Sequence, residues 1–287
     1  MSEHLPPSPK DRRSVLLVVD SDAPPPSVLE AAATFAAEWQ AQLAGLFVED
    51  IDLLRAAALP CSSELDFTTA AIRPLESFAL ARTLSQRAES MRAALAQMCT
   101  TSRIDWTFRI SQGEFVRETL AAAGEAELFI VCRASRSAPS TGGKPPLRPP
   151  GRRTAPAVLA VLDGGIGSSR VLRVAARLSR LFGAPLVVAF AASPDAASPG
   201  AATSAALRTA CRRLLSELKV EAAMHDVAVD DALQLLEAAQ RWKSGWLVIG
   251  RDCALLDEVH LRRLAVGLGH PIVLVQTPMT ETAAEKI

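Results

Sequence analysis

The chain contains a gapless internal repeat. Residues 14–48, SVLLVVDSDAPPPSVLEAAATFAAEWQAQLAGLFV, align without a gap with residues 157–191, AVLAVLDGGIGSSRVLRVAARLSRLFGAPLVVAFA. Asp20 falls on Asp163 and Trp39 falls on Phe182. Because self-similarity over such a stretch marks a repeated supersecondary unit, the chain is predicted to fold as two copies of one unit.

Each repeated segment reads as a strand, a turn, a helix and a second strand. The runs VLLVV and VLAVL are continuously apolar, which is typical of strands covered on both faces of a parallel sheet. The spacing of apolar residues then changes to a helical one. The residues that share one helical face are predicted to be Val28, Ala32, Phe35, Ala36, Trp39 and Leu43 in the first copy, and Val171, Ala175, Leu178 and Phe182 in the second.

A second similarity lies downstream in each copy. EFVRETLAAAGEAELFIVCR resembles DALQLLEAAQRWKSGWLVIGR, and both predict a short helix that leads into a buried strand. Before the first of them, IDWTFRIS alternates apolar and polar residues as a strand of period two does. Strands alternating with helices predict an α/β fold with two tandem Rossmann-like open parallel sheets flanked by helices.

The pattern divides the chain into five segments. We expect a flexible N-terminus over 1–13, a first domain over 14–134, a linker over 135–156, a second domain over 157–277 and a tail over 278–287. The first domain shows no recognisable last helix and strand, and residues 51–74 are an insertion that we expect to be mobile or partly helical. The linker is rich in Pro, Gly and Arg without interleaved aromatic residues, so a solvated tether is favoured over a nucleic-acid contact.

Composition excludes several classes of protein. The 31 basic and 31 acidic residues cancel, which gives no general attraction to nucleic acid or to anionic membrane. Five scattered cysteines lack metal-ligand spacing, so reduced thiols in a cytoplasmic protein are expected and no metal site is predicted. No stretch is long and apolar enough for a membrane span. No nucleophile motif or paired-carboxylate pattern is present, so no enzymatic activity is predicted.

These units resemble a tandem universal stress protein. The resemblance rests on VVDSD and VLDGG after the first strands, on ELFIVCRAS and GWLVIGRD at the fourth strands, and on GHPIVLVQTP at a fifth strand. It implies a Rossmann-like fold of the HUP type. It also implies that the fifth strand, Pro271–Val275, pairs with another subunit, so a homodimer or a protein partner is expected through this strand.

The nucleotide motif of that family is degenerate in this chain. Nucleotide-binding members carry G-x2-G-x9-G-[ST] after the fourth strand. Gly250 matches the first glycine, but Cys253 replaces the second, and Arg263 and Leu264 stand where Gly-[ST] belongs. The resemblance therefore predicts that the standard ATP-binding loop is lost. No cofactor is predicted with assurance, and ATP or AMP remains the weaker alternative.

The candidate binding residues lie where parallel strands end, since open α/β sheets bind ligands there. The resemblance implies that the aspartate at the end of each first strand lies beside the adenine and ribose of a nucleotide. Glycines at a helix start leave backbone N–H groups for an anion, and an arginine follows each fourth strand. The alternatives are an aspartate that orders its own turn, a serine that caps the helix, and solvated arginines. The candidates are Asp163, Gly164, Gly165, Gly167, Ser168, Ser169, Gly250 and Arg251 in the second copy, and Asp20 and Arg133 in the first.

Two functions follow from this pattern. The first is a non-enzymatic stress-response or regulatory protein that acts by binding a protein partner. The alternative is a sensor that binds an adenine nucleotide or another small anion at the second copy, through Asp163, the glycine turn and Arg251.

Overall fold

The computed structural model describes ten stretches of the chain. These are residues 13–20, 24–59, 62–65, 72–74, 77–122, 126–133, 155–191, 204–227, 232–253 and 256–277. The elements of the first half are β1 (Ser14–Val19), α1 (Pro26–Glu38), β2 (Gln42–Asp50), α2 (Ile51–Ala57), β3 (Ser63–Leu65), β4 (Ile72–Pro74), α3 (Ser77–Ser102), β5 (Trp106–Gly113), α4 (Phe115–Ala122) and β6 (Leu128–Cys132). Those of the second half are β7 (Ala157–Leu162), α5 (Ser168–Phe182), β8 (Leu186–Ala191), α6 (Ser204–Leu218), β9 (Ala222–Val227), α7 (Ala232–Arg241), β10 (Ser244–Gly250), α8 (Glu258–Gly267) and β11 (Ile272–Val275).

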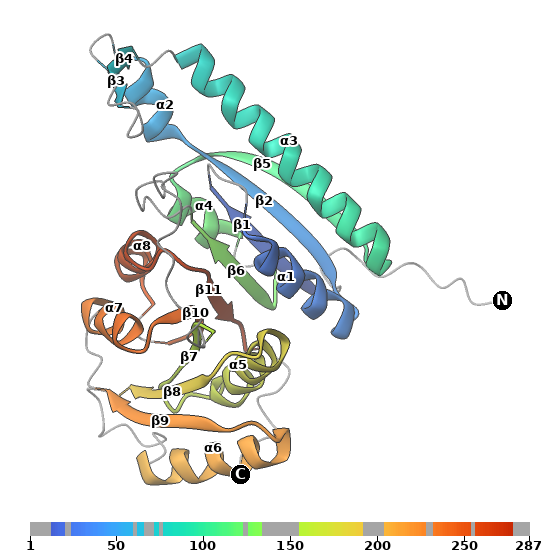
Figure 1. Cartoon of the computed structure of the whole chain (residues 1–287), viewed down its shortest axis with the longest axis vertical. Helices are drawn as coiled ribbons and strands as arrows, with labels where there is room; N and C mark the ends of the chain where they lie inside the picture. Colours follow the sequence, from blue (N-terminus) through green and yellow to red (C-terminus); the bar gives the residue numbers. More distant parts are fainter. Residues whose placement is uncertain are drawn as a thin grey trace, which may run out of the picture.

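One nine-stranded sheet runs through both halves (Figure 1). Its strand order is β5-β2-β1-β6-β11-β10-β7-β8-β9. Strands within each half pair in parallel, and the halves meet where β6 pairs antiparallel with β11, with Ile272 opposite Val131 and Val275 opposite Leu128. The predicted α/β class and its parallel, Rossmann-like halves are confirmed. The two sheets are continuous with each other.

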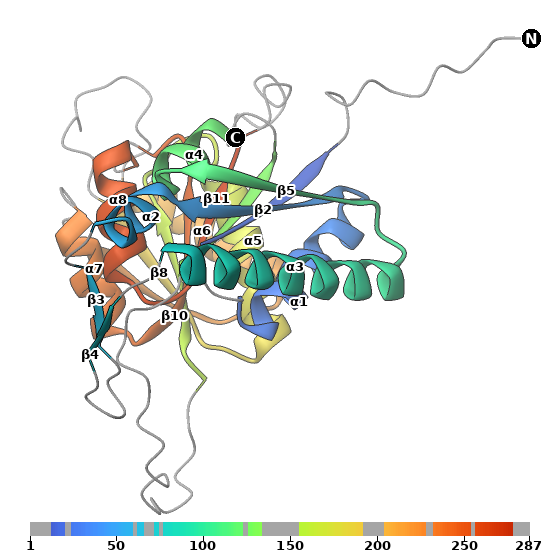
Figure 2. The same cartoon turned by 90° about the horizontal axis from the view of Figure 1, so that it is seen from above.

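Helices cover both faces of this sheet (Figure 2). Along β1, Val15, Leu17 and Val19 belong to one apolar core, whereas Leu16 and Val18 belong to the other. The first core is closed by α1, α3, α5 and α6, and the second by α4, α7 and α8. Burial on both sides explains the unbroken apolar runs, because successive side chains of a strand point to opposite faces.

The first predicted helix ends earlier than its apolar pattern suggested. α1 stops at Glu38, Gln40 has a φ of 51°, and β2 begins at Gln42. Leu43 therefore lies on β2 rather than on the helical face assigned to it, and that assignment is wrong. Leu43 is fully buried in the same core as Phe35, so helical spacing and strand burial gave the same apolar signal at this position.

The fifth strand is used differently from the prediction. β11 pairs in parallel with β10 on one side and antiparallel with β6 on the other, so both of its edges are occupied within the chain. The expected pairing of Pro271–Val275 with a second subunit is therefore wrong. β6 is the last described strand of the first half, and its open edge receives β11 in place of another subunit.

Parts of the sequence prediction fall outside the described residues. The insertion at 51–74 contributes α2 and the β3–β4 hairpin, which lie beyond the end of the sheet beside the start of α3 (Figure 1). The predicted linker lies outside the described residues, and so does the place where a last helix and strand of the first half would be. Cys61 also lies outside them. The predicted domain boundaries remain predictions. Among the described residues, no helix is long and apolar enough to cross a membrane.

Candidate functional site

The antiparallel junction sends the strands of the two halves in opposite directions. The carboxyl ends of β1, β2 and β6 therefore lie at one end of the sheet, and those of β7 and β10 at the other. The candidates Asp20 and Arg133 belong to the first end, whereas Asp163, Gly250 and Arg251 belong to the second. The structure thus separates the candidate residues into two sites.

At the first end an arginine is held by two aspartates. Arg133 Nε lies 3.3 Å from Asp20 Oδ2, and Arg133 Nη2 lies 3.7 Å from Asp50 Oδ2. The guanidinium also lies over the ring of Phe115, 5.6 Å from its centroid. The three charged side chains are only 8 to 21% exposed. Arg133 is therefore not the solvated surface residue considered for it, and its guanidinium is engaged by two carboxylates of the same chain.

The surroundings of this cluster are acidic. Glu49 is 9% exposed and accepts a hydrogen bond of 2.8 Å from Gln112 Nε2, on the neighbouring strand. Burial, together with the charge of Asp20, raises the pKa of the Cys132 thiol to about 12, so this thiol stays protonated at neutral pH. With two aspartates and one arginine, the cluster carries a net negative charge, which disfavours a phosphate group at this end of the sheet.

At the second end Asp163 orders its own turn. Its Oδ1 accepts a hydrogen bond of 2.9 Å from the Gly165 N–H and one of 3.3 Å from Ser168 Oγ. Gly164 has a φ of 80°, a conformation that residues with a side chain rarely adopt. Asp163 therefore has the role of an aspartate that orders its own turn, one of the alternatives considered for it.

The glycine turn leads directly into α5. The helix starts at Ser168, which is 8% exposed, and its N-cap is Gly167, while Ser169 is half-buried. A methyl group on Gly167 would come within 2.6 Å of Thr277 Oγ1. Gly167 therefore lets the chain after β11 pass close to the start of α5, where backbone N–H groups carry partial positive charge.

Arg251 lies in this second site and reaches the first half. Its Nη1 donates to Gln276 Oε1 at 3.3 Å, and its guanidinium is 5.9 Å from the ring centroid of Phe129 on β6. Gly250 ends β10 opposite Val275, so it positions Arg251 beside the end of β11. The structure brings the predicted residues of the second copy to one end of β7 and β10.

Residues of the first half also enter the second site, and the sequence did not indicate them. Arg170, in the first turn of α5, pairs with Glu127 and lies over the ring of Trp39, 4.9 Å from its centroid. Arg13 Nε lies 3.6 Å from the same Glu127, and the Gln276 N–H donates to the Glu127 carbonyl.

Asp50 was missed at the first site. The signal available for Asp50 was an acidic residue at the end of the second strand.

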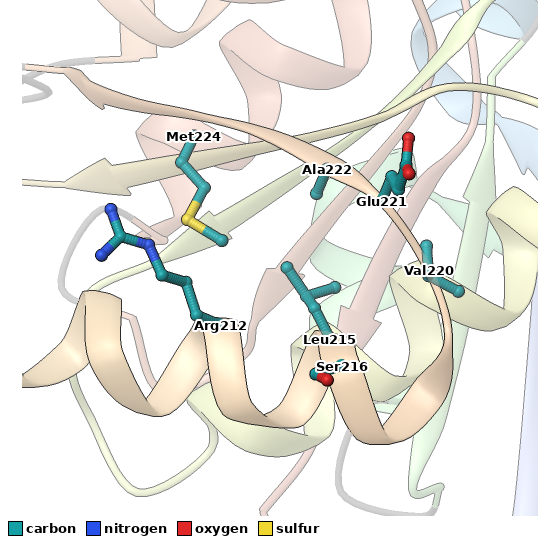
Figure 3. A pocket seen from close by; sticks show the side chains of 7 residues that line it. All are labelled: Arg212, Leu215, Ser216, Val220, Glu221, Ala222 and Met224. Atoms are coloured by element: carbon teal, nitrogen blue, oxygen red, sulfur yellow. The ribbon is translucent and has the colours of Figure 1, made fainter.

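A separate groove of about 540 Å³ lies between α6 and β9, toward the amino end of β9 (Figure 3). Its apolar floor is bordered by charged residues, and the lining consists of Arg212, Leu215, Ser216, Val220, Glu221, Ala222 and Met224. None of the predicted site residues lines it. Within the described part of the chain, no group of three His, Cys, Asp or Glu residues could hold a metal ion.

Comparison with known proteins finds similarity to solved structures. No protein-family model and no curated protein matches the chain. The chain is similar to a universal stress protein from Archaeoglobus fulgidus DSM 4304, with 13% identity and a TM-score of 0.48 over 93% of this chain and 97% of the other. It is also similar to a putative universal stress protein from Pseudomonas aeruginosa UCBPP-PA14, with 16% identity and a TM-score of 0.43 over 93% and 94% of the two chains.

Proposed function

We propose that this chain is a tandem protein of the universal stress class that regulates by binding a protein partner and has lost standard ATP binding. The observation that carries the proposal is the ion-pair cluster of Arg133 with Asp20 and Asp50. The cationic group that follows β6 is neutralised by acids of the same chain. A nucleotide phosphate at this end would meet two carboxylates before it reached the guanidinium.

In the second half, the glycine loop of the nucleotide motif is replaced by other residues. Cys253, a buried residue, follows β10 where the resemblance expects a glycine, and its N–H donates to the Gly250 carbonyl in a tight turn. Backbone groups used in that turn are not presented to a triphosphate. The proposal therefore includes the absence of ATP turnover.

A specific observation favours the alternative, an anion sensor in the second half. Gly167 at the start of α5, Thr277 and Arg251 lie at the same end of the sheet, and Gln276 links Arg251 to the segment that touches Gly167. A helix N-terminus beside an arginine suits a small anion such as a nucleoside monophosphate or inorganic phosphate.

Thermal unfolding with added ligands separates the two functions. ATP, AMP, cyclic nucleotides and phosphate are added at millimolar concentration, and a ligand at one hundred times its Kd stabilises the folded state by about 2.7 kcal/mol. The main proposal expects no shift with ATP and no release of phosphate from it. A shift with AMP or phosphate that Arg251→Gln removes and Arg133→Gln keeps would establish the sensor instead.

Regulation itself is tested in the organism that makes the protein. A strain lacking the chain should survive starvation or oxidative stress less well than the parent, and the wild-type gene should restore survival. A gene carrying Arg251→Gln should also restore it if partner binding, rather than anion sensing, is the function. Equal survival of the parent and the deletion strain would contradict a role in the stress response.

A further inference from the structure

The groove between α6 and β9 opens at the edge of the sheet. β9 is the end strand on the side of the second half, and among the described strands it pairs with β8 alone. Every residue that lines the groove belongs to α6, to β9 or to the turn between them, and β8 and α5 contribute none. The groove therefore lies on the flank of α6 that faces away from α5, along the edge strand.

The helix and the strand supply the lining through their own periodicities. On α6, Arg212 and Ser216 lie one turn apart on one flank, and the buried Leu215 lies between them and the sheet. On β9, Ala222 and Met224 are alternate residues and point to the face that α6 covers. Ala222 has only a methyl group, so the apolar floor is recessed beside the longer side chain of Met224 (Figure 3).

The two charged residues of the lining lie at opposite ends of the groove. Arg212 lies at the end of Met224, whereas Glu221 lies at the end of Val220 (Figure 3). Both are exposed, and among the described residues neither side chain forms an ion pair or a hydrogen bond. The groove therefore combines an apolar floor with a positive charge at one end and a negative charge at the other.

The carboxyl half of β9 is already engaged within the chain. The ring of His225 stacks on that of Trp242, with 5.0 Å between the centroids, and Asp226 forms an ion pair with Arg208 of α6. The groove lies beside the other half of the strand. It is open there because α6 leaves a volume of about 540 Å³ between its flank and β9.

We propose that this groove binds an extended peptide segment of the protein partner, with apolar side chains in the groove, an acidic residue at Arg212 and a basic residue at Glu221. The inference rests on the proposed function, because it names the surface on which the partner binds. An extended segment can run along the edge strand and direct alternate side chains into the groove. An apolar centre with a charged rim is a common arrangement of protein interfaces. The opposite charges at the two ends fix the direction of the segment.

The first test selects peptides on the immobilised full chain from a library of random dodecapeptides displayed on phage. Enriched peptides should carry apolar residues between an acidic and a basic residue, in one order. Ser216→Trp places an indole in the groove and should weaken binding of the enriched synthetic peptide at least tenfold in isothermal titration calorimetry. Ala210→Trp is the control, because Ala210 is exposed and lies on the opposite flank of α6. No enrichment, equal binding to Ser216→Trp, or an equal loss with Ala210→Trp would overturn the proposal.

The second test exchanges the charges of the groove. Arg212→Glu combined with Glu221→Arg reverses its polarity, so selection on this variant should enrich peptides whose acidic and basic residues stand in the reverse order. Arg213→Glu combined with Glu217→Arg is the matched control, because these exposed neighbours on α6 pair with each other at 3.3 Å and the exchange keeps the pair. Circular dichroism checks that each variant is folded. The same order of charges on the wild type and the groove variant, or a reversal by the control, would contradict the inference.

Two further measurements separate this inference from its neighbours. A gene carrying Ser216→Trp should fail to restore stress survival to the deletion strain, whereas Ala210→Trp should restore it. Restoration by both would remove the groove as the partner site and leave the proposed function standing, whereas a deletion strain that survives like its parent would contradict the proposed function itself. Sedimentation equilibrium of the chain alone should give a mass that Ser216→Trp leaves unchanged. A mass that falls with this change would assign the groove to a second copy and overturn the proposal.

Discussion

Two equivalent aspartates of the repeat have different partners in the structure. Asp163 and Asp20 both end a first strand of the repeat. Asp163 is followed by glycines and binds the N–H of Gly165. In the first copy the turn enters α1 through prolines, with Pro25 as N-cap and Pro26 as the first helical residue. Asp20 pairs with Arg133, whose Nε lies 3.3 Å from Asp20 Oδ2.

The contact of Gly167 with Thr277 yields a prediction about packing. Gly167→Ala places a methyl group 2.6 Å from Thr277 Oγ1, and overpacking of this kind typically costs about 1–3 kcal/mol of unfolding free energy. Urea denaturation should show this loss, and Thr277→Ala in the same chain should recover most of it. Gly250→Ala is the matched control, because its methyl group would meet Val171 at 3.7 Å, an ordinary contact. Equal stability of Gly167→Ala and wild type would contradict the close approach.

His270 predicts a loss of stability in mild acid. It precedes β11, its Nε2 lies 2.9 Å from Ser244 Oγ, and burial lowers its pKa below the ordinary value of 6.5. A lowered pKa in the folded state means that the unfolded chain binds the proton first. Stability is therefore full above about pH 6.5 and falls as the pH drops through the folded-state pKa.

The measurement is the free energy of unfolding in urea between pH 5 and 7.5. His270→Gln keeps a hydrogen-bonding side chain but removes the titration, so its stability should fall less steeply over this range. An unchanged slope for His270→Gln would contradict the assignment.

Single residues were predicted where the interaction is local. The partners through which Asp163 orders its own turn lie within five residues of it along the chain, so they can be recognised from the sequence. The partners of Arg133 and Arg170 could not be found in this way. Asp50 comes from a strand two places away in the sheet, and Glu127 belongs to the other half of the chain. Such pairs depend on strand order and on the antiparallel junction, which the periodicity of a sequence does not contain.

At the scale of elements, the repeat predicted the type and order of the helices and strands better than the pairing partners of the strands. The strands β1, β5 and β7 and the helix α5 lie where periodicity placed them. β11 was correctly predicted as a strand, because GHPIVLVQTP resembles the fifth strand of the universal stress family. The partner predicted for it, a second subunit, was wrong, because β11 pairs with β10 and β6 of the same chain. An apolar strand is equally suited to an edge shared between subunits and to the centre of one sheet.

β11 lies between two strands of the sheet, and this position predicts a large loss of stability when the strand is disrupted. Val273 is fully buried and lies between Val248 and Ile130. Val273→Pro removes a backbone donor and packing on both sides, which should cost roughly 3–6 kcal/mol of unfolding free energy. Ala222→Pro, at the first residue of edge strand β9, should cost much less, since proline is tolerated there. Unfolding in urea, followed by circular dichroism, compares the two. Similar losses would contradict the sheet order.

At the scale of the whole molecule, the halves are joined on more than one surface. Besides β6 and β11, three ion pairs among the described residues cross between the halves: Arg170 with Glu127, Arg177 with Glu38, and Arg262 with Glu114. Phe129 of the first half lies beside the Arg251 guanidinium, and Glu127 of the first half pairs with Arg170. Each half therefore completes the other, and separation would expose the apolar edges of β6 and β11 to water.

This mutual dependence predicts a single unfolding transition for the two halves. Neither half can unfold alone without uncovering a strand whose side chains are almost fully buried, such as Leu128, Ile130 or Leu274. Scanning calorimetry should give one peak whose calorimetric and van't Hoff enthalpies agree. In a second experiment, a protease site is inserted at Gly151 and cleaved, and the two fragments should stay together at the mass of the intact chain because the β6–β11 ladder holds them. Two resolved peaks, or fragments that separate after cleavage, would show that the halves are independent domains connected only by the linker.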